Sequence, residues 1–398
     1  MCKIVAVVCE YNPIHTGHVY QIGKIREMHG EDAVVICVMS GHFVQRGEVA
    51  MFDKFARAES AVKCGADLVL ELPYPYCASS AEFFARAGVE ISASVGAEFL
   101  VFGSESGDTD RLKLAAEIFS SDEAKRYISE HKNEGILRSR QRIYTELTGD
   151  DSGDVFSSND ILGVEYIRAM NALGVSVKPH AIRREGADYN DVSNETDYMS
   201  ATGLRKSILA ADFETAKRYI PKPALDVFAR EIAAKSAPAE MKNLEKVILA
   251  FLRIAEAKSL ARIAEISGGL EYRIIDAAKK ATNIETFFSL LETKKYTNGR
   301  LRRAVLYCLT GVTEAMLKQP PSYTQVLSFS EKGRAYLGRI RKSARIAVMT
   351  NPSGHGSRHT EKSMEQFGLS MKADELYALS LPKSRPAADY LRMSPYGG

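Results

Sequence analysis

The first 210 residues alternate between short, unbroken apolar runs and longer segments with helical periodicity. Unbroken apolar runs are typical of strands that a sheet buries on both faces. We expect strands at Ile4–Cys9, Ala33–Met39, Asp67–Leu72, Phe99–Gly103 and Val175–Val177, and helices at about 16–29, 54–65, 79–95, 109–131 and 158–173. This alternation predicts an α/β fold with a doubly wound parallel sheet, in which ligands bind at the carboxyl ends of the strands.

A proline-rich segment, 211–240, separates this part of the chain from a second one. We predict one domain over 1–215 and a mostly α-helical, basic region over 216–398. Within the second region, 241–290 has the pattern of amphipathic helices, and Ile346–Met349 is expected to form a short strand.

Charge is divided unevenly between the two regions. Residues 221–398 hold 29 Lys and Arg against 17 Asp and Glu, although the net charge of the whole chain is only +3. Basic side chains cluster at 294–303 and 332–345. Such an excess predicts a polyanionic partner, and a merely solvated helical surface is the alternative.

The composition is that of an ordinary globular protein, with 45% hydrophobic and 26% charged residues. No apolar run approaches the ~20 residues that span a bilayer, and the N-terminus lacks a signal-peptide pattern. We therefore expect a cytoplasmic protein without a membrane partner. The six cysteines show no zinc-binding spacing, so we expect them to be reduced and predict no metal site.

The strongest motif is His15-Thr16-Gly17-His18, just after the first predicted strand. The two histidines lie three residues apart, so they share one face of the helix that starts there. A helix N-terminus is a ready phosphate site, and two imidazoles beside it can donate to phosphate oxygens and stabilise a leaving group. Metal ligation is the alternative, but no third ligand is evident nearby.

A second motif, Ser200-Ala201-Thr202-Gly203-Leu204-Arg205, has the pattern of a capped helix N-terminus. Ser200 and Thr202 are good N-cap candidates, and Arg205 is one turn further along, where it can reach the same anion. Together with the first motif, it resembles the H-x-G-H nucleotidyltransferase superfamily. That superfamily contains class I aminoacyl-tRNA synthetases and small adenylyltransferases, which bind ATP and release pyrophosphate.

An ordered set of further segments narrows the resemblance. These segments are Ser40–Glu48, Asp53–Ala58, Glu71–Pro73, Phe102–Glu105, Ser158–Tyr166 and Ile182–Arg184. Their order resembles the bacterial tRNA(Met) cytidine acetate ligase family, densely over 1–205 and more thinly beyond. The family activates acetate with ATP to give acetyl-adenylate, and then acetylates N4 of the wobble cytidine of elongator tRNA(Met).

The resemblance implies a Rossmann-like sheet of the nucleotidyltransferase type and an ATP-binding catalytic domain over 1–215, with tRNA binding over 216–398. It implies catalytic roles for His15, His18, Lys54, Ser200, Thr202 and Arg205. It implies ATP binding by Val7, Val8, Glu10, Tyr11, Asn12, Pro13, His15, Gly17, His18, Tyr20, Gly103, Asn159, Arg183 and Arg184. Magnesium would accompany the nucleotide, and no protein partner is implied. Asn190 departs from the family pattern, which leads us to expect a histidine there.

Several residues keep two interpretations. His42 could contact substrate or simply occupy a turn. Lys54 and Arg57 could bind phosphate or tRNA, or lie on a solvated helix face. Glu71 and Glu105 could help to hold magnesium or be buried hydrogen-bonded carboxylates. Near the basic clusters, Tyr296 and Tyr307 could stack on unpaired bases or belong to the core.

Two other functions remain open from the sequence. A small-molecule adenylyltransferase that makes a dinucleotide-type cofactor would use the same two motifs, but it leaves the basic region unexplained. A non-catalytic tRNA-binding protein would explain the basic region, but it leaves the intact motif residues without a role.

Overall fold

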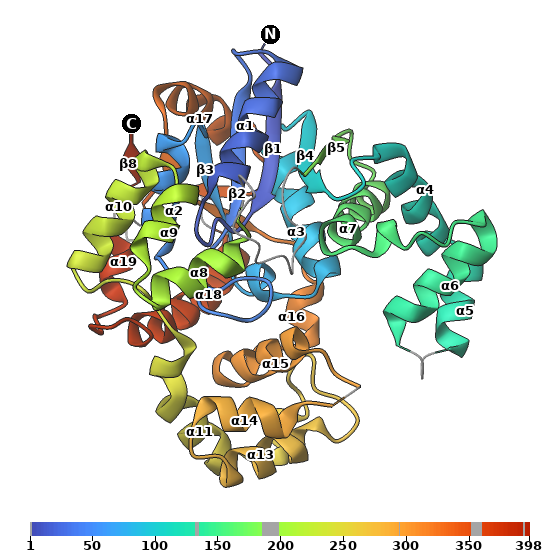
Figure 1. Ribbon diagram of the computed structural model, residues 1–398, viewed down its shortest axis with the longest axis vertical. Coiled ribbons are helices and arrows are strands. Elements are labelled where there is room, and N and C mark those ends of the chain that lie inside the picture. Colours follow the sequence, from blue (N-terminus) through green and yellow to red (C-terminus); the bar gives the residue numbers. More distant parts are fainter. Residues whose placement is uncertain (1, 132–134, 185–198, 294, 352–359, 393–394) are drawn as a thin grey trace.

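The computed structural model describes residues 2–131, 135–184, 199–293, 295–351, 360–392 and 395–398. A sheet lies at its centre with helices packed around it, and a separate helical lobe extends from one end (Figure 1). Asn190 lies outside the described residues.

The first five strands form the parallel core of the sheet. They are β1 (Ile4–Cys9), β2 (Val34–Ser40), β3 (Leu68–Leu72), β4 (Phe99–Ser104) and β5 (Lys178–Arg183), in the order β5-β4-β1-β2-β3. This order confirms the predicted doubly wound sheet and places the switch point between β1 and β4. The prediction for β5 is wrong in position: the strand starts at Lys178, after the apolar run, and its two ends are exposed.

The crossover helices are α1 (Thr16–His29), α2 (Lys54–Lys63), α3 (Ala81–Ser94), α4 (Thr109–Ser120), α5 (Asp122–Glu130), α6 (Ile136–Thr148) and α7 (Ser158–Leu173). The single helix expected over 109–131 is two helices, because Ser121 is extended and caps α5 by accepting from Ala124 N. Helix α6 was not among the predicted helices.

The chain returns to the sheet near its end. Strand β6 (Tyr323–Phe329) pairs antiparallel with β3, while β7 (Ala347–Met349) and β8 (Tyr396–Gly397) pair with β6. These strands are accompanied by α17 (Glu331–Ser343), α18 (Glu361–Leu379) and α19 (Ala388–Arg392). The expected short strand is confirmed as β7. The sheet thus contains strands from before and after residue 215. The division of the chain at that residue into a catalytic part and an RNA-binding part stays a prediction.

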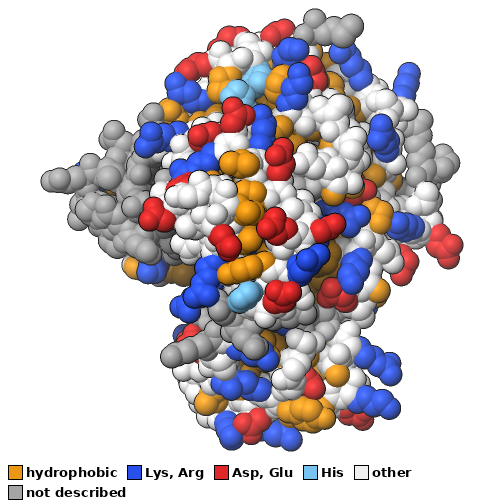
Figure 2. Space-filling view, turned by 90° about the vertical axis from the view of Figure 1, so that its right-hand side faces the viewer, with side chains coloured by type: hydrophobic (Ala, Val, Ile, Leu, Met, Phe, Trp, Pro, Cys, Tyr) orange, Lys and Arg blue, Asp and Glu red, His pale blue; other side chains and the backbone are white. Residues whose placement is uncertain are grey.

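Between the two sheet-forming parts the chain is helical. The helices are α8 (Ala201–Leu209), α9 (Phe213–Tyr219), α10 (Lys222–Ala233), α11 (Glu245–Ile254), α12 (Ala257–Leu260), α13 (Leu270–Lys280), α14 (Ile284–Leu291), α15 (Asn298–Thr310) and α16 (Glu314–Lys318). Helices α11, α13, α14 and α15 make the lobe at the bottom of Figure 1, which confirms the amphipathic helices expected over 241–290. Basic side chains are prominent on this lobe in Figure 2.

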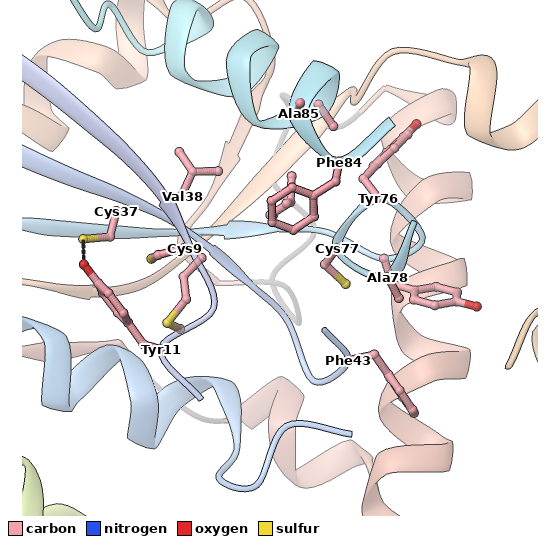
Figure 3. Close-up of a cluster of buried hydrophobic side chains, with 14 of the residues drawn as sticks. Cys9, Tyr11, Cys37, Val38, Phe43, Tyr76, Cys77, Ala78, Phe84 and Ala85 are labelled. Atoms are coloured by element: carbon pink, nitrogen blue, oxygen red, sulfur yellow. Dashed lines mark hydrogen bonds between the residues drawn. The ribbon is translucent and has the colours of Figure 1, made fainter. Parts of the chain in front are cut away.

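The core beneath the carboxyl ends of the strands is apolar and holds several cysteines. Cys9, Cys37 and Cys77 are buried there with Tyr11 and Phe84 (Figure 3). All six cysteines are free, as expected. No helix in the described part of the chain has the length and apolar character to cross a membrane.

Candidate active site

A cavity of about 490 Å³ opens at the switch point, beyond the carboxyl ends of β1 and β4. Most of the residues proposed for nucleotide binding or catalysis line it. These are Val8, Glu10, Tyr11, Asn12, His15, Gly17, His18, Tyr20, Gly103, Asn159, Arg183, Arg184, Ser200, Thr202 and Arg205. Val7, Pro13 and Lys54 are not among its lining residues. Two segments almost 200 residues apart therefore meet where a doubly wound sheet binds ligands.

The two histidines of the first motif lie against each other at the start of α1. His15 is the N-cap, and its ring stacks on that of His18 with centroids 3.7 Å apart. The backbone N–H of His15 donates to Nδ1 of His18 at 3.2 Å. Because Nδ1 accepts this hydrogen bond, the neutral ring of His18 carries its proton on Nε2 and can donate it to a ligand.

Both histidines are neutral near pH 7. Burial, together with the nearby charge of Arg184, lowers the pKa of His15 to about 3. Burial, His15 and Arg184 also hold the pKa of His18 well below its usual value. Two uncharged imidazoles thus lie beside arginines. The imidazoles can donate hydrogen bonds to an anion without adding further positive charge next to the arginines.

The turn before α1 is strained and braced. Tyr11 has a left-handed backbone with φ of 44°, which is unfavourable for a bulky residue. Its ring packs edge-on against His18 at 4.8 Å, and its hydroxyl lies 3.5 Å from Sγ of Cys37. Asn12 accepts a hydrogen bond from Met51 N at 2.8 Å. These contacts hold the turn, and with it the two histidines, in one position.

The second motif reaches the first through its arginine. Ser200 caps α8 by accepting from Gly203 N at 3.2 Å, as predicted. Arg205 donates from Nη1 to the carbonyl of Asn12 at 2.9 Å and from Nη2 to Oγ1 of Thr202 at 3.1 Å. The N-termini of α1 and α8 therefore face one cavity, which gives it two positive dipole ends.

The opposite wall comes from β4 and α7. Asn159 donates from Nδ2 to Oε1 of Glu105 at 2.5 Å, and its backbone N–H donates to Oε2 of the same carboxylate. Glu105 is thus a hydrogen-bonded carboxylate that positions Asn159. Gly103 lies under Arg184, since a Cβ there would stand 3.3 Å from the Cγ of that arginine.

Arg57 is a structural clamp. It is fully buried, and its guanidinium donates to four main-chain carbonyls, those of Glu10, Ser40, Gly41 and Phe52. Arg57 therefore joins the carboxyl ends of β1 and β2. The sequence interpretation that placed it on a solvated helix face is wrong.

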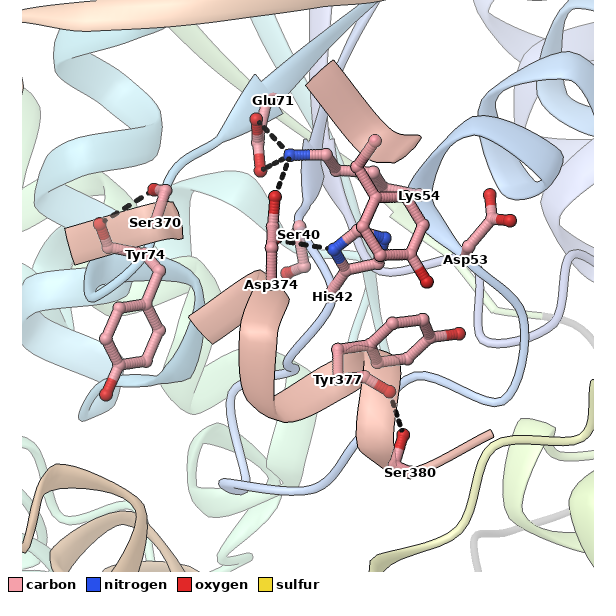
Figure 4. Close-up of polar contacts among 12 residues, drawn as sticks. Ser40, His42, Asp53, Lys54, Glu71, Tyr74, Ser370, Asp374, Tyr377 and Ser380 are labelled. Carbon is pink, nitrogen blue, oxygen red and sulfur yellow. Dashed lines mark hydrogen bonds and ion pairs between the residues drawn. The ribbon is translucent and has the colours of Figure 1, made fainter. Parts of the chain in front are cut away.

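Lys54 belongs to a different polar cluster, which joins α2, the end of β3 and α18 (Figure 4). Its ammonium lies 3.0 Å from Glu71 and 3.3 Å from Asp374, and it is 1% exposed. Asp374 also contacts Nδ1 of His42 at 2.6 Å, and the His42 ring stacks on Tyr377. The predicted catalytic role of Lys54 does not fit this position, because the cluster is sealed by α18.

The loop 41–50, which lines the cavity through Val44–Arg46 and Glu48, is docked on α15. Arg302 pairs with Glu48, and Arg303 pairs with Glu265 and approaches the carbonyl of Gln45. Two basic side chains of the 294–303 cluster, Arg302 and Arg303, are thus engaged in ion pairs within the protein. Tyr296 and Tyr307 are buried in the core, so the interpretation that these two rings stack on unpaired bases is wrong.

Sequence reasoning missed Arg46 and Glu48, which line the same cavity. Their segment follows the second strand, and the predicted parallel sheet already puts that strand end beside the first motif.

A larger hollow of about 1290 Å³ lies elsewhere and is lined by Arg341, Lys342 and Arg345 of the second basic cluster.

Magnesium has no prepared protein cage among the described residues, which contain no cluster of three or more potential metal ligands. Glu71, one of the residues considered for it, is occupied by Lys54. Magnesium commonly binds through substrate phosphates and only one or two carboxylates, so the residues fit an ion that arrives on a nucleotide.

Three comparisons agree on the relatives of this chain. The family model of HIGH nucleotidyl transferases matches residues 2–390. The tRNA(Met) cytidine acetate ligases of Caldanaerobacter subterraneus and Halothermothrix orenii are each 33% identical, over 95% and 98% of both chains respectively. Thermotoga maritima TmcAL, crystallised with alpha-thio ATP, superposes with a TM-score of 0.91 at 31% identity, covering 99% of each chain.

The similarity extends over nearly the whole length of each relative and includes the helical lobe as well as the sheet. The chain therefore belongs to the HIGH nucleotidyl transferase family, among the tRNA(Met) cytidine acetate ligases.

Proposed function

We propose that the protein is an ATP-dependent acetate ligase that forms acetyl-adenylate and acetylates N4 of the wobble cytidine of elongator tRNA(Met). One observation carries this proposal: Arg205 of the second motif donates to the carbonyl of Asn12 of the first at 2.9 Å, which brings both motifs to one cavity at the switch point. The names of the relatives supply the acyl group and the RNA.

In the first step, an acetate oxygen attacks the α-phosphate of ATP in line, and pyrophosphate leaves. The enzyme needs no nucleophile of its own, so it acts by positioning and charge stabilisation. His18 would donate from Nε2 to the developing charge, and Arg205 and Arg184 would neutralise the phosphates. Magnesium would be carried by the phosphates and would supply further positive charge.

The cavity also suits the rest of the nucleotide. Apolar side chains, including Phe102, Leu162 and Ile182, line it together with the cationic residues. An apolar wall beside a cationic wall is what a purine base joined to a triphosphate requires, and TmcAL of Thermotoga maritima was crystallised with an ATP analogue.

In the second step, the cytosine amine attacks the mixed anhydride and AMP leaves. A wobble base lies in a loop, where it can be turned out of its stack and read by its edges. The helical lobe and the hollow near Arg341 and Lys342 would contact the RNA backbone, with the salt dependence that phosphate contacts impose. We expect the enzyme to act in the cytoplasm, where its RNA substrate is.

The test uses unmodified elongator tRNA(Met), ATP, magnesium and isotope-labelled acetate, followed by nucleoside mass spectrometry. The proposal predicts labelled N4-acetylcytidine at the wobble position. Pyrophosphate release without acetylcytidine would contradict the acyl donor or its acceptor, and release that instead requires a phosphorylated cofactor precursor would favour a small-molecule adenylyltransferase.

A matched pair of variants ties the activity to the cavity. Arg205→Ala removes a charged donor of the kind worth about 1.5–3 kcal/mol, so kcat/KM for ATP should fall by about 10- to 100-fold. Lys206→Ala removes an exposed cation next to it on α8 and should leave kcat/KM unchanged. Equal effects of the two changes would contradict the assigned site.

A further inference from the structure

The second step of the proposed reaction releases a proton, and that proton needs an acceptor. As the N4 amine of cytosine attacks the acetyl carbon, a C–N bond forms, the bond from that carbon to the phosphate oxygen breaks, and AMP leaves. The amine must lose one N–H proton, because the product is a neutral amide. A positioned side chain that takes such a proton contributes about 10²–10⁴-fold to the rate.

Two carboxylates occur among the described residues that line the cavity, Glu10 and Glu48. Glu48 pairs with Arg302 and lies 4.0 Å from Nη2 of Arg205, so two arginines neutralise the negative charge of its carboxylate. Glu10 follows directly on the last residue of β1, at the carboxyl end of the strand that leads into the histidine motif. Of the two carboxylates, Glu10 is the closer in sequence to the histidine motif.

The position of Glu10 is fixed from two sides. Its Oε1 accepts a hydrogen bond from Gln45 N at 2.9 Å, and its main-chain carbonyl accepts one from Nη1 of Arg57 at 2.6 Å. Gln45 of the loop 41–50 therefore holds the carboxylate in place, and Arg57 holds the backbone of Glu10. A base that is held in this way loses little freedom when it takes a proton.

The histidines are poorer candidates. Burial lowers the pKa of His15 to about 3 and that of His18 well below its usual value, so both imidazoles are weak bases. Burial instead raises the pKa of Glu10, against the opposing effects of the Gln45 N–H and of Arg205, Arg57 and Arg46. A carboxylate of raised basicity is better matched to accepting a proton near neutral pH.

We propose that Glu10 is the proton acceptor of acyl transfer, taking the N4 proton as AMP departs. This assignment rests on the proposed function. It also separates the two half-reactions, because acetate is already ionised at neutral pH and its attack on ATP releases no proton.

The test compares Glu10→Gln with the wild type in both half-reactions. Glutamine keeps the size of the side chain and a carbonyl oxygen to accept from Gln45 N, so the fold is preserved. At saturating ATP and acetate, we expect the ratio of acetyl transfer to acetate-dependent exchange of labelled pyrophosphate into ATP to fall by about 100-fold or more, because transfer alone needs the proton acceptor. Glu10→Asp should recover part of the transfer rate.

Glu48→Gln is the matched control, since it makes the same change on the same cavity. The ratio of its transfer rate to its exchange rate should equal that of the wild type. Wild-type transfer by Glu10→Gln, or an equal loss of both half-reactions, would overturn the assignment. If the wild type itself exchanges pyrophosphate but acetylates no cytidine, the proposed function fails, and this assignment fails with it.

Discussion

The cavity holds two imidazoles that stay uncharged beside arginines. His15 is 7% exposed, and its ring shares the start of α1 with that of His18 at 3.7 Å. Protonating either ring would place a second cation beside Arg184 at a site where burial penalises the charged form. The cost of that charge is a property of the folded chain alone, so it appears in the stability of the protein.

This cost predicts a stability that depends on pH. The pKa of His15 is lowered from 6.5 to about 3 in the folded chain, so the unfolded chain binds the proton more readily between these values. The contribution is complete above pH 6.5 and is lost as the pH falls, by about 1.4 kcal/mol per pH unit for one such group. Urea unfolding between pH 7 and pH 5 should show a shallower pH slope for His15→Gln, and identical slopes would contradict this origin.

At the scale of elements, the loop 41–50 connects the nucleotide cavity to the helical lobe. Gly47 lies against the backbone of α15, with φ of 74°, and a Cβ there would stand 2.6 Å from Arg303 N. The loop contacts Glu10 through Gln45 N on its other side. Only a glycine fits this close approach, so the docking of the lobe is built into the sequence of the loop.

Gly47→Ala should therefore cost more than backbone strain. Gly311, at the end of α15, has a similar φ of 78° but open space around it. We expect Gly311→Ala to cost about 1–2 kcal/mol for the left-handed conformation, and Gly47→Ala to cost about 1–3 kcal/mol more for the clash. Chemical denaturation of both variants measures the difference, and equal losses would show that the loop is not tightly docked.

A buried ion cluster ties α18 to the sheet. Lys54 from α2 joins Glu71 at the end of β3 to Asp374 on α18, and all three side chains are nearly inaccessible to solvent. Removing the ammonium would leave the buried Glu71 carboxylate without its cation and Asp374 with His42 as its remaining partner, which is strongly unfavourable.

Lys54→Met should thus destabilise the protein by about 3–5 kcal/mol. The comparison is Lys280→Met, which breaks the ion pair with Asp276 on the exposed surface of α13 and should cost at most about 1 kcal/mol. Thermal unfolding distinguishes the two variants. A small effect of Lys54→Met would show that the cluster is not a tie between helix and sheet.

Over the whole molecule, the parts that follow from local sequence were predictable and the parts that follow from tertiary pairing were not. The first four strands are predominantly apolar and the two motifs cap helices, so the parallel core and most of the cavity could be predicted. The return of β6 to pair with β3 joins residues more than 250 positions apart, and no local pattern encodes it. Lys54 was misplaced for the same reason: its partner Asp374 lies in the last helix but one.

The most direct test of the mechanism follows the oxygen atoms of acetate. The reaction is run with acetate labelled with ¹⁸O in both carboxylate positions, with ATP and tRNA, and the AMP is analysed by mass spectrometry. Attack of acetate on the α-phosphate in this cavity predicts one ¹⁸O in each AMP formed and the other in the acetyl group of the tRNA. AMP without the label, or the label in pyrophosphate or inorganic phosphate, would contradict an acetyl-adenylate.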